Sequence, residues 1–115
     1  MFKREWRFYL TDMLEFSENV ACYSDGFTQD EFIATGVNYD ATIRNIELIG
    51  EAATHIPEDI RNSYQHIPWR QLVATRNRLI HGYLGIDNDT LWSIIQTDIP
   101  ELIVELQKII SALKQ

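Results

Sequence analysis

The sequence predicts an all-α protein, an antiparallel bundle of four to five helices. Over several long stretches, apolar residues recur at the spacing of three and four that places them on one face of a helix. No stretch shows the alternation typical of a strand. The connections between the helical stretches are short, which favours antiparallel neighbours. The 115 residues fit a single domain, 1–115, large enough to bury a core without a metal or a disulfide.

Two helices are expected in the first third of the chain. Helical spacing of apolar residues predicts the first over residues 5–23, and the Ser-Asp-Gly run at 24–26 ends it. Thr28 followed three residues later by Glu31 is the pattern of a capping box. It predicts a short second helix that Gly36 ends.

The next helix is expected to open at Asn38, a good N-cap residue, and to reach His55 before Pro57. It carries one narrow polar strip, formed by Asp40, Arg44, Glu47, Glu51 and His55. The remaining surface is mostly apolar, which predicts the central helix of the bundle. Asn45 lies opposite the strip, so we expect a buried amide with fixed partners. Small residues such as Gly50 allow a neighbouring helix to approach closely.

Three further segments complete the expected bundle. A short helix is predicted from Pro57 to about residue 65, and Pro68 suits the first position of the helix that follows. The last helix should begin at 88–90 and run toward Lys114. Pro100 should kink or divide it, because proline removes a backbone donor.

Charge is unevenly distributed along the chain. The net charge is −7, which argues against a protein that coats nucleic acid through bulk positive charge. Residues 60–86, however, contain four arginines and no Asp or Glu, so this segment carries +4 and the rest −11. The segment is either a local anion-binding face or a set of solvated arginines.

The sequence also bears on the compartment. Cys22 is the single cysteine, so no intrachain disulfide can form and a reducing compartment is expected. The N-terminal segment is too charged for a signal peptide, and no stretch is apolar enough to span a membrane. We therefore expect a cytoplasmic protein.

The helix after Pro68 carries an arginine where an apolar residue is expected. One face of this helix is apolar and consists of Trp69, Leu72, Val73, Leu79, Ile80 and Tyr83. Arg76 projects from the centre of that face. Moving an unpaired guanidinium out of water costs a desolvation free energy on the order of several kcal/mol. Arg76 should therefore pair internally with Glu47 or Glu51, face a subunit interface, or line an anion site.

His81 follows Arg76 by five residues, about 140° round an ideal helix. The two side chains can cooperate only if the helix ends or distorts there, and Gly82 favours such an end. The helix dipole would then favour a protonated imidazole suited to proton transfer, although a capping or surface role is the alternative. The phenol of Tyr83 either meets solvent or a partner, or anchors the following loop.

Three stretches resemble one family, the HepT-like branch of the HEPN (higher eukaryotes and prokaryotes nucleotide-binding) proteins. They are IRNIELIGEAA at 43–53, IPWRQLVATRNRLIHGYLGID at 67–87, and LWSIIQTDIPEL at 91–102. Within the second, Arg76, His81 and Tyr83 match the family motif R-x4-H-x-Y. This resemblance covers nearly the whole chain.

The resemblance implies a homodimer in which the Arg and His of both subunits meet in a cleft. Family members are toxins that cleave RNA without a metal, and the antitoxin is a minimal nucleotidyltransferase that attaches AMP to the motif tyrosine. Carried over, Arg76 and His81 are catalytic, Tyr83 is the modified residue, and Asn77 and Arg78 support the site or bind phosphate. The family implies no cofactor and no membrane partner.

Such chemistry suits these residues. Metal-free RNA cleavage needs a base, an acid, and a cation for the charged phosphorane, and a two-fold dimer supplies two copies of His81 and Arg76. Two other hypotheses stay open. The chain is either a non-catalytic subunit that binds nucleotide or a nucleotidyltransferase, or a structural module in which Arg76 forms an internal ion pair.

Overall fold

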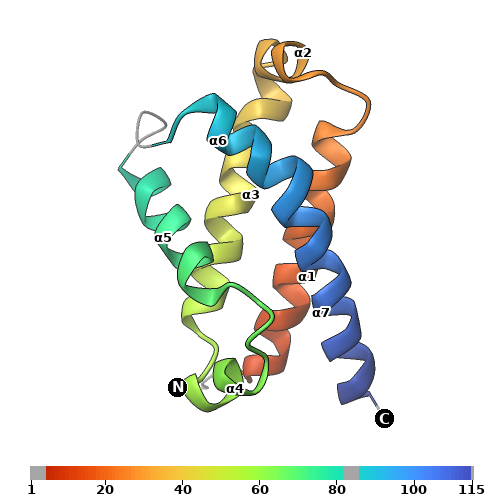
Figure 1. The fold of residues 1–115 in the computed structure, drawn as a ribbon, viewed down its shortest axis with the longest axis vertical. Helices are drawn as coiled ribbons and strands as arrows, with labels where there is room; N and C mark the ends of the chain where they lie inside the picture. Colours follow the sequence, from red (N-terminus) through yellow and green to blue (C-terminus); the bar gives the residue numbers. More distant parts are fainter. Residues whose placement is uncertain (1–4, 82–85, 115) are drawn as a thin grey trace.

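The computed structural model describes residues 5–81 and 86–114, and these residues form an up-and-down helical bundle (Figure 1). Helices α1 (Trp6–Ser24), α3 (Val37–Thr54), α5 (Trp69–Ile80) and α7 (Ile99–Leu113) run alternately up and down. Short helices α2 (Gln29–Ala34) and α4 (Glu58–Ser63) lie at opposite ends. This confirms the predicted all-α bundle.

The core lies between α1, α3 and α7. Helix α1 packs against both α3 and α7, whereas α5 packs chiefly on α3. The inward side chains are almost wholly aliphatic, and several are fully buried: Leu10, Met13, Val20, Ile43, Ala53 and Leu106. Helix α5 therefore lies at the edge of the bundle, with one side open to solvent (Figure 1).

The first two helices follow the predicted pattern. Helix α1 begins and ends within one residue of the expected 5–23. At α2 the Thr28 hydroxyl accepts from the Glu31 amide N–H at 3.2 Å, and the Thr28 amide donates to the Glu31 carboxylate at 2.9 Å. These reciprocal bonds are the predicted capping box, and they lower the pKa of Glu31.

The start of α3 differs from the prediction. The N-cap is Gly36, whose φ of +67° favours glycine, rather than Asn38. The Asn38 side chain instead donates to the Tyr23 carbonyl at 3.0 Å, which ties α3 to the end of α1. Asn45 is buried as expected, accepting from Asn19 at 3.1 Å and donating to the Ala41 carbonyl at 2.8 Å.

The last predicted helix is divided, as Pro100 indicated. It consists of α6 (Asn88–Ser93), a π-helical turn η2 (Ile94–Asp98), and α7. In this turn the Ile99 amide donates to the Ile94 carbonyl, five residues back. Because Pro100 has no N–H, the widened turn before it rearranges the backbone bonds without breaking the helix.

None of the helices in the described part of the chain is long and apolar enough to cross a bilayer.

Candidate functional site

Helix α5 is fixed at its start by Trp69, which is buried. Its indole N–H donates to the carbonyls of Arg61 and Tyr64 at 3.2 and 3.1 Å. These are carbonyls at the end of α4, so the bond joins the short helix to the first turn of α5. Pro68, expected at the first helical position, is the N-cap residue.

Gly50 of α3 sets how closely α5 approaches. A Cβ atom at Gly50 would lie 2.3 Å from the Cβ of Arg76 and 2.7 Å from the carbonyl oxygen of Leu72. No side chain fits such a gap without a shift of one helix. Glycine therefore allows α5 to rest directly on α3 at the level of Arg76, as the small residue in the sequence indicated.

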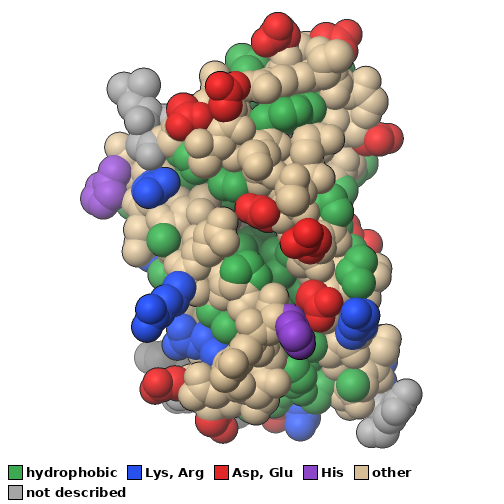
Figure 2. Space-filling view, viewed as in Figure 1, with side chains coloured by type: hydrophobic (Ala, Val, Ile, Leu, Met, Phe, Trp, Pro, Cys, Tyr) green, Lys and Arg blue, Asp and Glu red, His purple; other side chains and the backbone are tan. Residues whose placement is uncertain are grey.

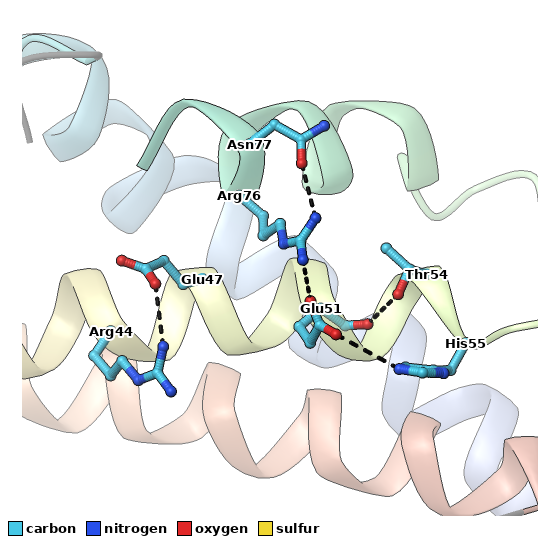
Figure 3. Close-up of polar contacts among 7 residues, drawn as sticks. All are labelled: Arg44, Glu47, Glu51, Thr54, His55, Arg76 and Asn77. Atoms are coloured by element: carbon cyan, nitrogen blue, oxygen red, sulfur yellow. Dashed lines mark hydrogen bonds and ion pairs between the residues drawn. The ribbon is translucent and has the colours of Figure 1, made fainter. Parts of the chain in front are cut away.

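Arg76 forms an ion pair with Glu51 of α3 (Figure 3). Its other terminal nitrogen donates to the Asn77 side-chain oxygen at 2.9 Å, and 26% of the side chain stays exposed. The predicted acidic partner is thus found in the same protomer. A guanidinium has five N–H donors and these contacts use two, so donors remain for an anion.

The choice between the two predicted partners follows from the helix crossing. Glu47 lies one turn before Glu51 and pairs instead with Arg44 of its own helix, at 3.1 Å. Glu51 is next to Gly50, where α5 makes its closest approach. The partner of Arg76 is therefore the carboxylate at the crossing.

The ion pair extends into a contact chain that sequence reasoning missed. The second Glu51 oxygen lies 3.6 Å from Nε2 of His55, and the His55 ring stacks on Tyr9 of α1 with centroids 4.5 Å apart. Glu51 thus links α5 to α3 and, through His55, to α1. The polar strip indicated that His55 is near Glu51, but its stacking on Tyr9 depends on tertiary packing.

His81 lies just beyond the end of α5, as predicted. The last helical residue is Ile80, and His81 is exposed, with φ −81° and ψ 6°. It forms no hydrogen bond or ion pair with Arg76 among residues 5–81 and 86–114. The structure therefore does not join the two predicted catalytic side chains by a polar contact within one protomer, and Tyr83 and Gly82 lie outside the described residues.

The expected apolar face of α5 is partly wrong. Leu72, Arg76 and Leu79 lie toward α3, whereas Ile80, placed on that face from the sequence, is 52% exposed. On a helical wheel Ile80 is about 100° from Leu79, so it points past the contact with α3. Asn77 and Arg78, the predicted supporting residues, are exposed.

Helix α6 begins close after the motif and has a side-chain cap. Asp87 accepts from the Thr90 amide at 2.7 Å and from its hydroxyl at 2.9 Å. These two bonds favour the charged carboxylate and lower the pKa of Asp87. In the part of the chain that the structure describes, no three His, Cys, Asp or Glu side chains gather to hold a metal ion.

Comparisons with known proteins place this geometry in a family. The model of the family "Ribonuclease HepT-like" matches residues 13–109. The chain is 39% identical to "Putative RNase MJ1216" of Methanocaldococcus jannaschii, over 94% of this chain and 89% of that protein. It is 38% identical to "Putative RNase MJ0125" of the same organism, over 98% and 97%.

A third relative comes from another organism. "Probable ribonuclease HepT" of Thermococcus cleftensis is 35% identical, over 93% of this chain and 97% of that protein. No solved structure matches the chain significantly. The family match spans the α3–α5 crossing and the Arg-x4-His segment alike, and the chain belongs to the HepT-like ribonuclease family.

Proposed function

We propose that this chain is the toxin of a toxin-antitoxin pair in the cytoplasm. It is an endoribonuclease that cleaves RNA without a metal ion, at an Arg/His site between two copies of the chain. A partner nucleotidyltransferase silences it by transferring AMP to Tyr83. The observation that carries the proposal is the exposed His81 just past the end of α5. It follows by five residues Arg76, which has N–H donors left for an anion, and the chain belongs to the HepT-like family.

Each proposed role follows from the state of the side chain. One His81 takes the proton of the ribose 2′-hydroxyl, whose oxygen attacks the phosphorus, and the His81 of the second copy protonates the departing 5′-oxygen. The remaining N–H groups of Arg76 stabilise the charge on the phosphorane. One chain supplies a single His81 and the reaction needs both a base and an acid, so we place the site in a cleft shared by a two-fold dimer.

The test of the nuclease is a growth assay with purified-protein cleavage in parallel. Expression of the wild type should arrest growth, whereas Arg76→Ala and His81→Ala should not, and RNA cleavage should fall about 100-fold or more. The matched controls are His66→Ala and Arg44→Ala, which remove an exposed residue of the same type elsewhere. Arrest by folded His81→Ala would reject the proposed catalysis.

The same assay separates the alternatives. The Arg76–Glu51 pair is also what a purely structural role for Arg76 would give. In that case Arg76→Ala would lower stability, while His81→Ala would change neither stability nor growth. A non-catalytic subunit would bind the transferase equally well with or without His81.

Silencing is tested on Tyr83. The phenol oxygen would attack the α-phosphate of ATP and release pyrophosphate, which leaves an AMP group beside Arg76 and His81. That group would block an RNA phosphate by occupancy and by charge repulsion. Intact-mass measurement after co-expression with the transferase should show an AMP adduct on the wild type and none on Tyr83→Phe. An undiminished adduct on Tyr83→Phe would reject this position.

A further inference from the structure

The outward side of α5 has a composition unlike the rest of the protein surface. We define the outer face of α5 as five exposed residues: Arg70, Ala74, Asn77, Arg78 and His81. At 100° per residue these positions lie within about 100° of one another, so they form a single stripe. None of the five is acidic, although the chain as a whole carries −7.

The two arginines of this stripe have no polar partner within the described part of the chain. Arg70 and Arg78 form no hydrogen bond or ion pair with any residue among 5–81 and 86–114, in contrast to Arg44 and Arg76, which both have carboxylate partners. Their charge is thus available to a partner. Figure 2 shows Lys and Arg side chains along the side of the molecule occupied by α5, whereas Asp and Glu side chains lie near α2, over the middle of the face and at the α4 end.

The stripe leads away from His81 toward α4. With a rise of about 1.5 Å per residue, Arg70 and Arg78 are about 12 Å apart along the helix, too far to hold one phosphate together. Beyond Arg70 lies an open hollow of about 610 Å³, whose lining includes Arg61, Asn62 and Gln65 together with one acid, Glu58. A negatively charged chain that starts at His81 would meet Arg78, then Arg70, then this hollow.

We infer that the outer face of α5 is the track for the RNA strand next to the cleaved bond, with Arg78 and Arg70 on separate, non-adjacent phosphate groups. This rests on the proposed ribonuclease function and names the surface that holds its substrate. Single-stranded RNA fits because its phosphates repeat along one line and contacts to them need no base sequence. The rest of the acidic body repels the strand, so binding is confined to this side.

The experiment measures binding apart from cleavage. Full-length His81→Ala protein is titrated with a fluorescein-labelled single-stranded oligouridylate at several salt concentrations, alone and with Arg70→Gln, Arg78→Gln or both. Each lost phosphate contact should reduce the slope of log affinity against log salt by about 0.7. The control is Arg44→Gln, which removes an arginine that is 65% exposed on α3 and should leave the slope unchanged.

The outcomes distinguish this inference from the function on which it rests. A smaller slope for the α5 variants alone supports the track, and thermal melting confirms that they stay folded. An unchanged slope, or an equal change for Arg44→Gln, overturns it. The inference is also overturned if the α5 variants keep the salt slope of RNA binding but lose binding to the transferase. That result would assign the stripe to a protein partner. Wild-type protein that cleaves no RNA in a parallel assay would instead reject the nuclease proposal.

Discussion

Arg76 is a charged side chain on the packed side of its helix, and only 26% of it is exposed. It projects from the packed side of α5, and Glu51 and Asn77 compensate for the burial of its charge. From the sequence, an internal ion pair, for instance with Glu47 or Glu51, was one of three predictions for Arg76, beside a subunit interface and an anion site. Only the crossing of α3 and α5 at Gly50 decides between the two carboxylates. A helical wheel gives the direction of a side chain around the helix axis, but not the level along the axis at which two helices cross.

Removing each carboxylate tests this assignment. Glu51→Ala should lower the free energy of unfolding by about 1–2 kcal/mol, since the partly buried guanidinium loses its counter-charge. Glu47→Ala breaks a pair within one helix, to an arginine that is 65% exposed, and should cost only about 0.3–0.5 kcal/mol. Urea denaturation of both variants measures the difference. Equal losses would show that the contact between α3 and α5 does not depend on Glu51.

At the scale of elements, local signals in the sequence located most helix ends. Thr28 with Glu31 predicted the start of α2, and Pro100 the break before α7, because caps and proline act within one turn. The start of α3 was missed, since Asn38 serves α1 instead. The π-helical turn could not be predicted from the sequence, because the presence of a proline does not show whether the helix before it kinks or widens.

The crossing of α3 and α5 gives a prediction with an unusual sign. Alanine normally stabilises a helix by about 1 kcal/mol over glycine. Gly50→Ala should instead lower the free energy of unfolding, because the added carbon meets Arg76 and the Leu72 carbonyl, and overpacking costs about 1–3 kcal/mol.

Circular dichroism during urea denaturation measures the effect of Gly50→Ala. The control is Thr54→Ala, one turn further along α3 at an exposed position, which should change stability little. A more stable Gly50→Ala protein would mean that the two helices do not touch here.

For the whole molecule, the sequence predicted the architecture well, because several helices with long apolar stripes can bury those stripes by packing together as a bundle. It predicted only in part which side of α5 faces solvent. Ile80 shows why: its position follows the helical spacing, yet α3 covers only part of the apolar face. A cleft that holds Arg76 and His81 from two copies would exist only in a dimer. The structure of a single chain does not test it, so the shared cleft stays a prediction.

The assembly gives a prediction about concentration. Light scattering after gel filtration should report twice the 13.5 kDa mass of the chain. Because the proposed cleft takes His81 from both copies, RNA cleavage per chain should fall on dilution as the dimer separates. A monomer with undiminished nuclease activity would contradict the shared cleft, whatever the effect of the single substitutions.

The edge position of α5 has a consequence for which substitutions this fold tolerates. Its inward side is constrained by Gly50, Glu51 and the core, but substitutions on the opposite side disturb no packing. Substitutions of those surface residues should therefore change RNA binding along the proposed track while the scaffold folds as before. On this proposal, the contacts to substrate and the contacts that stabilise the fold lie on opposite sides of one short helix.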